Sequence, residues 1–220
     1  GIFLQLVVIR WHACLFPVIS FYKNFSLLSC LAGLGAGYAL AGNRHIPLLL
    51  TPILLGVQII LFTLLAGTGQ EELLSILRVE PITSQLSMGL FATINPFPLT
   101  ALYLFLLVNF ALTFLAFLPL GQTCGLLLDS VEALKSYSWN LIGSLLGVAA
   151  MFCLSGLWTS PTVWFAMAFI LLAPFLGATK VSLYSGSLIG LISLVFLAWP
   201  TAGDKLQLTS PYQQLEMKSL

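Results

Sequence analysis

Residues 97–120 read FPLTALYLFLLVNFALTFLAFLPL, an apolar run without a single charged side chain. A helix needs about 20 mostly apolar residues to cross the hydrocarbon core of a bilayer. Such a segment must be helical, because lipid offers no hydrogen-bond partner to a bare backbone N–H or C=O group. The run therefore predicts a membrane-spanning helix.

The composition of the whole chain also fits a lipid environment. Hydrophobic residues make up 59% of the sequence and charged residues only 7%, whereas a soluble domain carries about 25% charged residues. The mean hydropathy is +1.04. The net charge is +1, and no cluster of Lys or Arg points to a nucleic-acid partner. The lipid bilayer is the expected partner.

Similar apolar blocks recur along the chain. They cover residues 21–42, 46–66, 138–158, 162–178 and 181–199, and a shorter block covers 1–9. Together with 97–120 they predict an all-α, polytopic bundle of six or seven transmembrane helices over residues 1–200, because no short alternating strands of a membrane barrel are present. We interpret the short first block as the end of a helix whose start lies outside this sequence, and residues 201–220 as a linker and the first strand of a truncated soluble domain.

Two connections between the blocks are long. In the first, 67–96, Thr68 and Glu71 have capping-box spacing, which predicts a short interfacial helix near 71–78. In the second, 121–137, Asp129 or Ser130 could cap a short helix that leads into the next span.

Three of the blocks carry glycines four residues apart. The pairs are Gly33/Gly37, Gly143/Gly147 and Gly186/Gly190. This spacing puts small residues on one helix face, where a neighbouring backbone can approach closely. The pairs predict helix packing rather than a ligand.

Polar side chains near the first two blocks form a candidate site. Gln5 and Arg10 lie at the end of the first block, and Lys23 and Asn24 open the second. Together they could form an intramembrane polar cluster that holds an anion or a carboxylate. The alternative is that both cations extend to lipid headgroups.

The other polar residues predict structure rather than chemistry. Gln58 and Asn109 are single amides inside spans, where hydrogen bonds between helices account for them. His12 is expected at a helix end, without the neighbours that a metal site needs. Ser185 lacks a general base, so no catalytic residue is assigned. The tryptophans are expected as interfacial anchors; they are Trp11, Trp139, Trp158, Trp164 and Trp199.

The distribution of Lys and Arg predicts an orientation. With seven spans, one side collects Arg10, Lys23, Arg78, Lys205 and Lys218, and the other Arg44, Lys135 and Lys180. The positive-inside rule then places the C-terminus in the cytoplasm of a multi-pass cell-membrane protein.

Three stretches in this order resemble the membrane module of spermidine synthase-like fusion proteins. QLVVIRWHACLFPVISFYKNFSLLSCLAGLGAGYALAGNR at 5–44 resembles their opening helices, and KSYSWNLIGSLLGVAAMFCLSGLWTSPTVWF at 135–165 resembles a later helix. SPYQQLEM at 210–217 is similar to the strand that begins the synthase domain.

The resemblance implies that the bundle anchors a downstream aminopropyltransferase-like domain and exchanges substrate or product with it. It assigns to Gln213 a contact with decarboxylated S-adenosylmethionine, the donor substrate of that domain. The catalytic carboxylates would lie downstream, so the chain by itself is not expected to be an enzyme. The family often has Glu where this chain has Gln5, which puts any ion-coupled role of that position in doubt.

Two alternatives stay open. GLGAGYALAGNR at 33–44 also resembles the second helix of major facilitator-type transporters, although the acidic residue usual in the following loop is absent. The other alternative is a purely structural membrane anchor. Partners beyond lipid are the downstream domain and, as an open question, a second copy of the chain.

Overall fold

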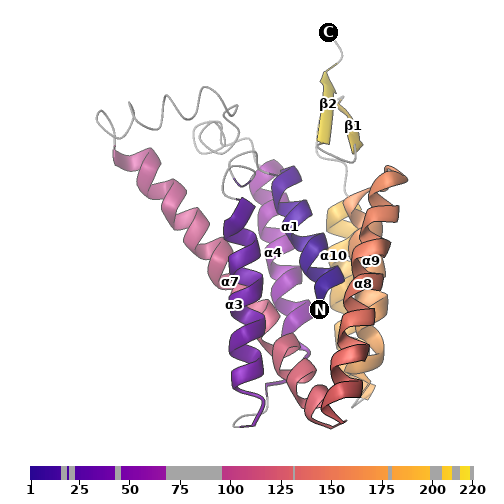
Figure 1. Cartoon of the computed structure of the whole chain (residues 1–220). Helices are drawn as coiled ribbons and strands as arrows, with labels where there is room; N and C mark the ends of the chain where they lie inside the picture. The colour runs from indigo at the N-terminus through magenta and orange to yellow at the C-terminus, as the bar shows by residue number, and fades with distance from the viewer. Residues whose placement is uncertain are drawn as a thin grey trace.

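The computed structural model of the chain is an upright bundle of helices with a β-hairpin near one end (Figure 1). The structure describes residues 1–15, 19, 23–42, 46–67, 96–130, 132–177, 180–198, 205–209 and 214–218. The interfacial helix predicted near 71–78 lies outside these residues.

Seven helices occur in the described part of the chain, one for each predicted apolar block. They are α1 (Ile2–Leu15), α3 (Lys23–Ala39), α4 (Leu50–Gly67), α7 (Pro96–Asp129), α8 (Ala133–Gly156), α9 (Pro161–Leu176) and α10 (Lys180–Ala198). The predicted helical fold is confirmed. Three helical segments are long and apolar enough to cross a membrane: Thr100–Asp129 in α7, and the whole of α8 and α10. The apolar parts of α1, α4 and α9 are shorter.

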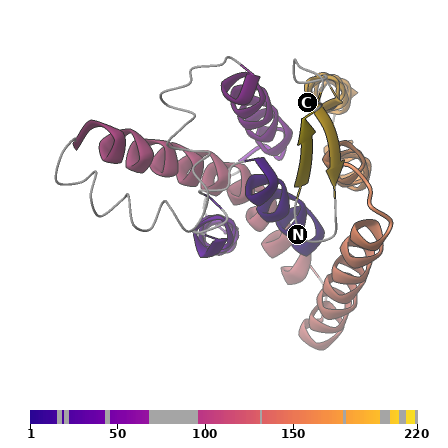
Figure 2. The same cartoon turned by 90° about the horizontal axis from the view of Figure 1, so that it is seen from above.

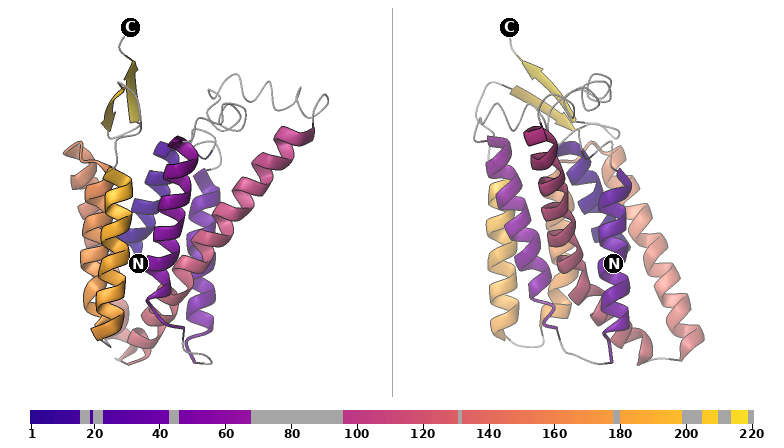
Figure 3. Two further views of the ribbon diagram at one scale, coloured as in Figure 1. Left: turned by 180° about the vertical axis from the view of Figure 1, so that it is seen from behind. Right: turned by 90° about the vertical axis from the view of Figure 1, so that its left-hand side faces the viewer.

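Helix α1 lies in the middle of the bundle. It packs against α3 on one side and against α8 and α9 on the other. Helix α4 joins α7 to α10, and α10 in turn packs against α9 (Figures 2 and 3). The core between these helices holds large apolar side chains with almost no exposed surface; the largest are Trp11, Trp164, Phe62, Phe117 and Phe165.

Helix α7 is longer than the sequence suggested. It has 34 residues, which at about 1.5 Å per residue give roughly 50 Å, against about 30 Å of hydrocarbon core. It accordingly runs obliquely across the bundle in Figure 1. The prediction of a long connection over 121–137 was wrong, because α7 continues to Asp129 and α8 begins at Ala133. The N-cap of α8 is Glu132, not Asp129 or Ser130, and its side chain makes no capping hydrogen bond.

The crossing of α3 and α7 explains why α7 continues. A Cβ atom added to Gly37 would lie 2.8 Å from Cα of Gly121 and 2.6 Å from the backbone nitrogen of Gln122. A Cβ added to Gly33 would overlap the carbonyl oxygen of Phe114. Backbones at such a distance leave room for hydrogen only, so Gly121 serves helix packing here and does not end the helix.

The other glycine pairs pack less uniformly. The space beside Gly186 of α10 is occupied by Leu176 of α9, whose Cδ1 would lie 2.8 Å from an added Cβ. Gly190 faces Phe169. Gly147 lies against Phe3 of α1, but Gly143 has no neighbour within 4 Å of an added Cβ. The packing prediction is therefore confirmed for all of these glycines except Gly143.

Large apolar side chains also cover the outside of the bundle. On α8, Phe152 is 79% exposed and Leu145 is 69% exposed. Further exposed examples on other helices are Leu104, Leu107, Ile170 and Leu191. A surface of this kind is suited to hydrocarbon and not to water.

Two strands follow α10. They are β1 (Lys205–Thr209) and β2 (Gln214–Lys218), and they pair antiparallel from Lys205 opposite Lys218 to Thr209 opposite Gln214. The sequence predicted one strand at the start of a domain. The structure instead forms a hairpin whose second strand covers the end of the SPYQQLEM stretch.

Candidate functional site

The centre of the bundle holds a buried polar network built around Gln58 of α4. The Nε2 atom of Gln58 donates to Oδ1 of Asn109 at 2.7 Å and to Oγ1 of Thr113 at 3.0 Å, both on α7. The same nitrogen lies 3.0 Å from Nε2 of His12 on α1. All four side chains are at most 1% exposed. An amide nitrogen carries only two hydrogens, so the three acceptors share two N–H donors.

His12 extends the network to α3. Its Nδ1 atom lies 3.1 Å from Oγ of Ser26. When Nε2 accepts from Gln58, the proton of a neutral imidazole is on Nδ1 and is donated to Ser26. This pattern needs an uncharged ring, which suits the apolar surroundings. One network thus joins α1, α3, α4 and α7.

Aromatic rings enclose this network on one side. The ring centroids of Phe62 and Trp11 are 5.8 Å apart, and Phe62 lies 5.8 Å from His12 and 5.3 Å from Phe105. Trp11 also meets Phe165 of α9 edge-to-face at 5.4 Å. The rings exclude water and lower the local dielectric constant, which strengthens the hydrogen bonds beside them.

Not every buried polar atom is paired. Within the described residues, four such atoms have no hydrogen-bond partner: Oε1 of Gln5, Oε1 of Gln58, Nε1 of Trp11 and Oγ1 of Thr63. Turning the Gln58 amide over would leave its nitrogen unpaired in place of its oxygen. The network therefore stabilises helix contacts at the cost of one unused acceptor.

Arg10 forms a second polar contact on the opposite face of α1. Its guanidinium donates to Oγ of Ser155 on α8 and lies 4.6 Å above the ring of Trp164 on α9. The indole nitrogen of Trp164 is in turn bonded to Oγ1 of Thr159 at 2.8 Å. Arg10 thus connects α1 to both helices of the α8–α9 pair.

The members of the predicted polar cluster lie in different surroundings. Gln5 is buried in α1, Arg10 is half-buried against α8 and α9, and Asn24 is exposed in the first turn of α3. The side chain of Lys23 lies outside the described part of the structure, and so does Gln213.

Several expectations about single residues are now settled. The hydrogen bond of Gln58 with Asn109 confirms that these amides join two helices. His12 lies in the last turn of α1, as predicted for a helix end, but its side chain is completely buried. Trp11 and Trp164 are buried and not interfacial, because their rings pack between helices; Trp139 and Trp158 are exposed.

The sequence alone does not identify His12 as a member of the network. Gln5 and His12 are seven residues apart, which is two turns of a helix. The two polar side chains therefore lie on one face of an otherwise apolar helix. A histidine on an apolar helix needs hydrogen-bond partners, and the amide of Gln58 was available. The spacing of Gln5 and His12 can be recognised only if the first helix is taken to continue beyond Arg10.

Gln122 makes a separate contact at the other end of the bundle. Its Oε1 atom accepts from the backbone N–H of Ile46 at 2.7 Å, and its Nε2 atom donates to the carbonyl oxygen of Leu40 at 3.0 Å. A single side chain of α7 thus holds both ends of the connection between α3 and α4. A further bond joins α4 to α7, in which Oγ1 of Thr51 donates to the carbonyl oxygen of Ala116 at 2.8 Å.

The described residues contain no group of three or more His, Cys, Asp or Glu side chains that could hold a metal ion. The network combines amides, hydroxyls and one imidazole, without a carboxylate. Comparison with protein-family models, curated proteins and solved structures gives no match for this chain. The site is therefore interpreted from its own geometry, which is that of a hydrogen-bonded junction between four helices.

Proposed function

We propose that residues 1–200 are the membrane module of a spermidine synthase-like protein, with six or seven helices in the cell membrane. The module would anchor an aminopropyltransferase-like domain on the cytoplasmic side and exchange substrate or product with it. The observation that carries this proposal is the transition from α10, an apolar helix of membrane-spanning length, to the hairpin of β1 and β2.

The hairpin is evidence for a larger β-structure beside the bundle. A two-stranded hairpin is marginally stable in water and needs further strands or a covering helix. The second strand begins at Gln214, directly after Gln213, the residue to which the resemblance assigns the donor contact. A further domain attached to this hairpin would supply both the missing strands and the site for decarboxylated S-adenosylmethionine.

The exposed apolar surface supports the membrane setting of the shorter helices as well. Val57 and Leu61 on α4 and Ile170 on α9 are exposed, although these helices are shorter than α7, α8 and α10. Helices that lie side by side with spanning helices and carry the same kind of surface share the same solvent.

The test is the parent reading frame followed by an activity assay. We expect a Gly-rich nucleotide-binding loop within about a hundred residues after Leu220, the scale of one domain. The full-length protein should transfer an aminopropyl group from decarboxylated S-adenosylmethionine to a diamine. Absence of that loop would overturn the synthase part of the proposal.

A purely structural anchor is the second candidate, and the polar network favours it. Gln58 bonds to both His12 and Asn109, so its amide nitrogen is already used for helix contacts. A transporter of the major facilitator type would instead move a solute through the bundle. Uptake of polyamines or nucleosides into vesicles that contain the full-length protein separates the two, because only a transporter gives saturable flux.

A further inference from the structure

The turn between α8 and α9 places a tryptophan in a strained backbone conformation. Trp158 has a φ of 55°, and among the described residues it is the only one other than glycine with a positive φ. In this left-handed conformation the Cβ atom crowds the backbone, which glycine avoids because it has no Cβ. Glycine is the usual residue at this position after a helix. Trp158 therefore occupies its position at a cost in stability.

The backbone bonds of the turn explain why this position is left-handed. The N–H group of Thr159 donates to the carbonyl oxygen of Leu154 at 3.3 Å, and the N–H group of Trp158 donates to that of Ser155 at 3.2 Å. This pair of bonds ends many helices, and it needs a left-handed residue directly before the outermost donor. The strain at Trp158 is thus a consequence of how α8 ends.

Side chains on both sides of the turn hold it in this conformation. Oγ1 of Thr159 donates to the end of α8 at 2.7 Å and accepts from the indole nitrogen of Trp164 on α9 at 2.8 Å. Arg10 of α1 contacts Ser155 before the turn and Trp164 after it. A strained residue persists where its surroundings hold it in place. None of these contacts uses the indole of Trp158, so the turn presents that side chain to the outside.

The distance from Trp158 to a second exposed tryptophan matches the thickness of a bilayer. Trp139, near the start of α8, is 71% exposed, and Trp158 is 56% exposed. The two are 19 residues apart in the sequence, which gives roughly 28 Å along a helix, against about 30 Å of hydrocarbon core. Tryptophans at this spacing stand at the two membrane–water interfaces.

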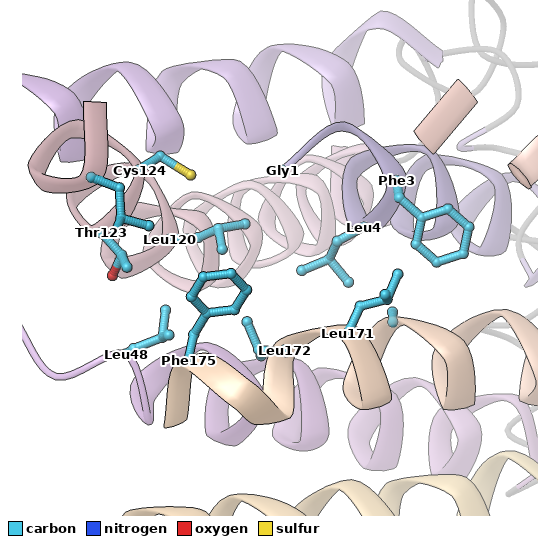
Figure 4. Close-up of a pocket in the computed structure, with 12 residues that line it drawn as sticks. Gly1, Phe3, Leu4, Leu48, Leu120, Thr123, Cys124, Leu171, Leu172 and Phe175 are labelled. Carbon is cyan, nitrogen blue, oxygen red and sulfur yellow. The ribbon is translucent and has the colours of Figure 1, made fainter. Parts of the chain in front are cut away.

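The outside of the bundle away from these two positions is apolar. Leu145 and Phe152 lie between the two tryptophans on α8 and are exposed. On another side of the bundle, the walls of the groove in Figure 4 are likewise largely apolar, with Leu4 from α1, Leu120 from α7 and Leu172 from α9. Side chains that combine an apolar ring with an N–H donor thus stand at the limits of an apolar band. There, lipid ester and phosphate oxygens can accept a hydrogen bond from an indole.

We propose that Trp158 is kept in its left-handed position because its indole binds the headgroup region of one lipid leaflet. That leaflet lies on the side of the hairpin, because the turn between α8 and α9 is at the same end of the bundle as β1 and β2 (Figure 1). The inference rests on the proposed membrane setting and adds to it the residue that contacts this leaflet. The spacing from Trp139 favours a lipid interface over a protein partner, which would not require a distance of one bilayer thickness.

The test measures how deep the indole of Trp158 lies. Residues 1–220 are reconstituted in phosphatidylcholine vesicles with a nitroxide-labelled phosphatidylcholine, which carries the nitroxide either near the headgroup or near the end of one acyl chain. The emission lost in Trp158→Gly gives the contribution of Trp158, because glycine fits the left-handed turn and leaves the other tryptophans in place. We expect the shallow nitroxide to quench this contribution about twofold more than the deep one. Trp158→Phe gives a second, independent difference, and Trp139→Phe is the matched control for the opposite interface.

A second pair of variants tests the strain itself. Trp158→Gly and Trp158→Ala both remove the indole and differ only in whether the residue has a Cβ atom. In detergent, Trp158→Gly should unfold about 2–4 °C above Trp158→Ala, because only glycine adopts the left-handed conformation without strain. Equal melting temperatures would mean that the position stores no strain, and they would overturn the reason given for keeping tryptophan there.

The quenching results distinguish this inference from the proposed membrane setting. Stronger quenching of Trp158 by the deep nitroxide, or quenching by neither, would overturn the interfacial site. If Trp139 is still quenched by the shallow nitroxide in that case, the membrane setting stands. Absence of quenching for both tryptophans would overturn both. The synthase part of the proposed function is tested separately by the parent reading frame.

Discussion

Gln58 of α4 donates a hydrogen bond of 2.7 Å to Asn109 of α7, although 51 residues separate them in the sequence. Both side chains are buried among apolar helices. In such surroundings an amide has no water to bond with, so the helices must be positioned to let the two groups meet. The pair therefore fixes the register of α4 against α7.

Replacing Gln58 by Leu should destabilise the bundle by about 1–2 kcal/mol, because His12, Asn109 and Thr113 lose their shared partner. The measurement is the midpoint of unfolding in mixed detergent micelles. Val57→Leu is the control, since Val57 is the exposed neighbour on the same helix. An unchanged midpoint in Gln58→Leu would contradict the structural role of the network.

A double-mutant cycle tests whether the network acts as a unit. Asn109→Leu alone should also destabilise the bundle, and the combination with Gln58→Leu should cost less than the two single changes added together. Strict additivity would mean that the bond between Gln58 and Asn109 contributes nothing of its own.

Replacing Gly37 by Ala should separate α3 from α7. The new methyl group would meet Gly121 and Gln122 at distances shorter than van der Waals contact, and such overpacking costs about 1–3 kcal/mol. Gly35→Ala is the matched control on the same helix, because nothing lies within 4 Å of its added Cβ. Thermal unfolding followed by tryptophan fluorescence compares the two. Equal melting temperatures would contradict the close crossing.

Arg10→Lys should weaken the contact of α1 with α8 and α9. A lysine keeps the positive charge but loses the planar group that lies over Trp164, an interaction worth about 0.5–2 kcal/mol. The loss should become smaller when Trp164 is already replaced by Leu. If Arg10→Lys and the unmodified protein unfold alike, the stacking on Trp164 does not contribute to stability.

Gln122→Leu should expose the backbone that Gln122 now holds. The N–H group of Ile46 loses its acceptor, and its hydrogen exchange should accelerate roughly tenfold, as expected for a bond worth about 1–1.5 kcal/mol. Thr123→Val is the control, since Thr123 bonds only within its own helix in the described structure. Hydrogen exchange measured by mass spectrometry detects the difference, and unchanged protection of Ile46 in Gln122→Leu would contradict this role.

The apolar blocks were sufficient to predict where the helices lie, because burial in lipid needs long uninterrupted runs. The end of α7 was missed because GQTCG at 121–125 has the composition of a loop. In the structure those residues serve contacts with α3, and Gln122 bonds to backbone groups of Leu40 and Ile46. A sequence does not reveal which backbone groups lie opposite a side chain.

For the polar residues, too, the sequence predicts some contacts and only the structure shows the others. Gln58 and Asn109 were predicted to bond between helices because a buried amide needs a partner. That His12 completes their network depends on the rotation of α1 about its axis, which a nearly uniform apolar helix does not encode locally. The partners of Arg10 on α8 and α9 are 145 and 154 residues away, and only the tertiary arrangement brings them to it.

The insertion of the bundle into lipid is measured most directly by expressing residues 1–220 in cells and washing the isolated membranes with alkaline carbonate. We predict that the protein stays in the membrane pellet and is released only by detergent. Recovery of a folded, monomeric protein in the aqueous wash, without detergent, would contradict it.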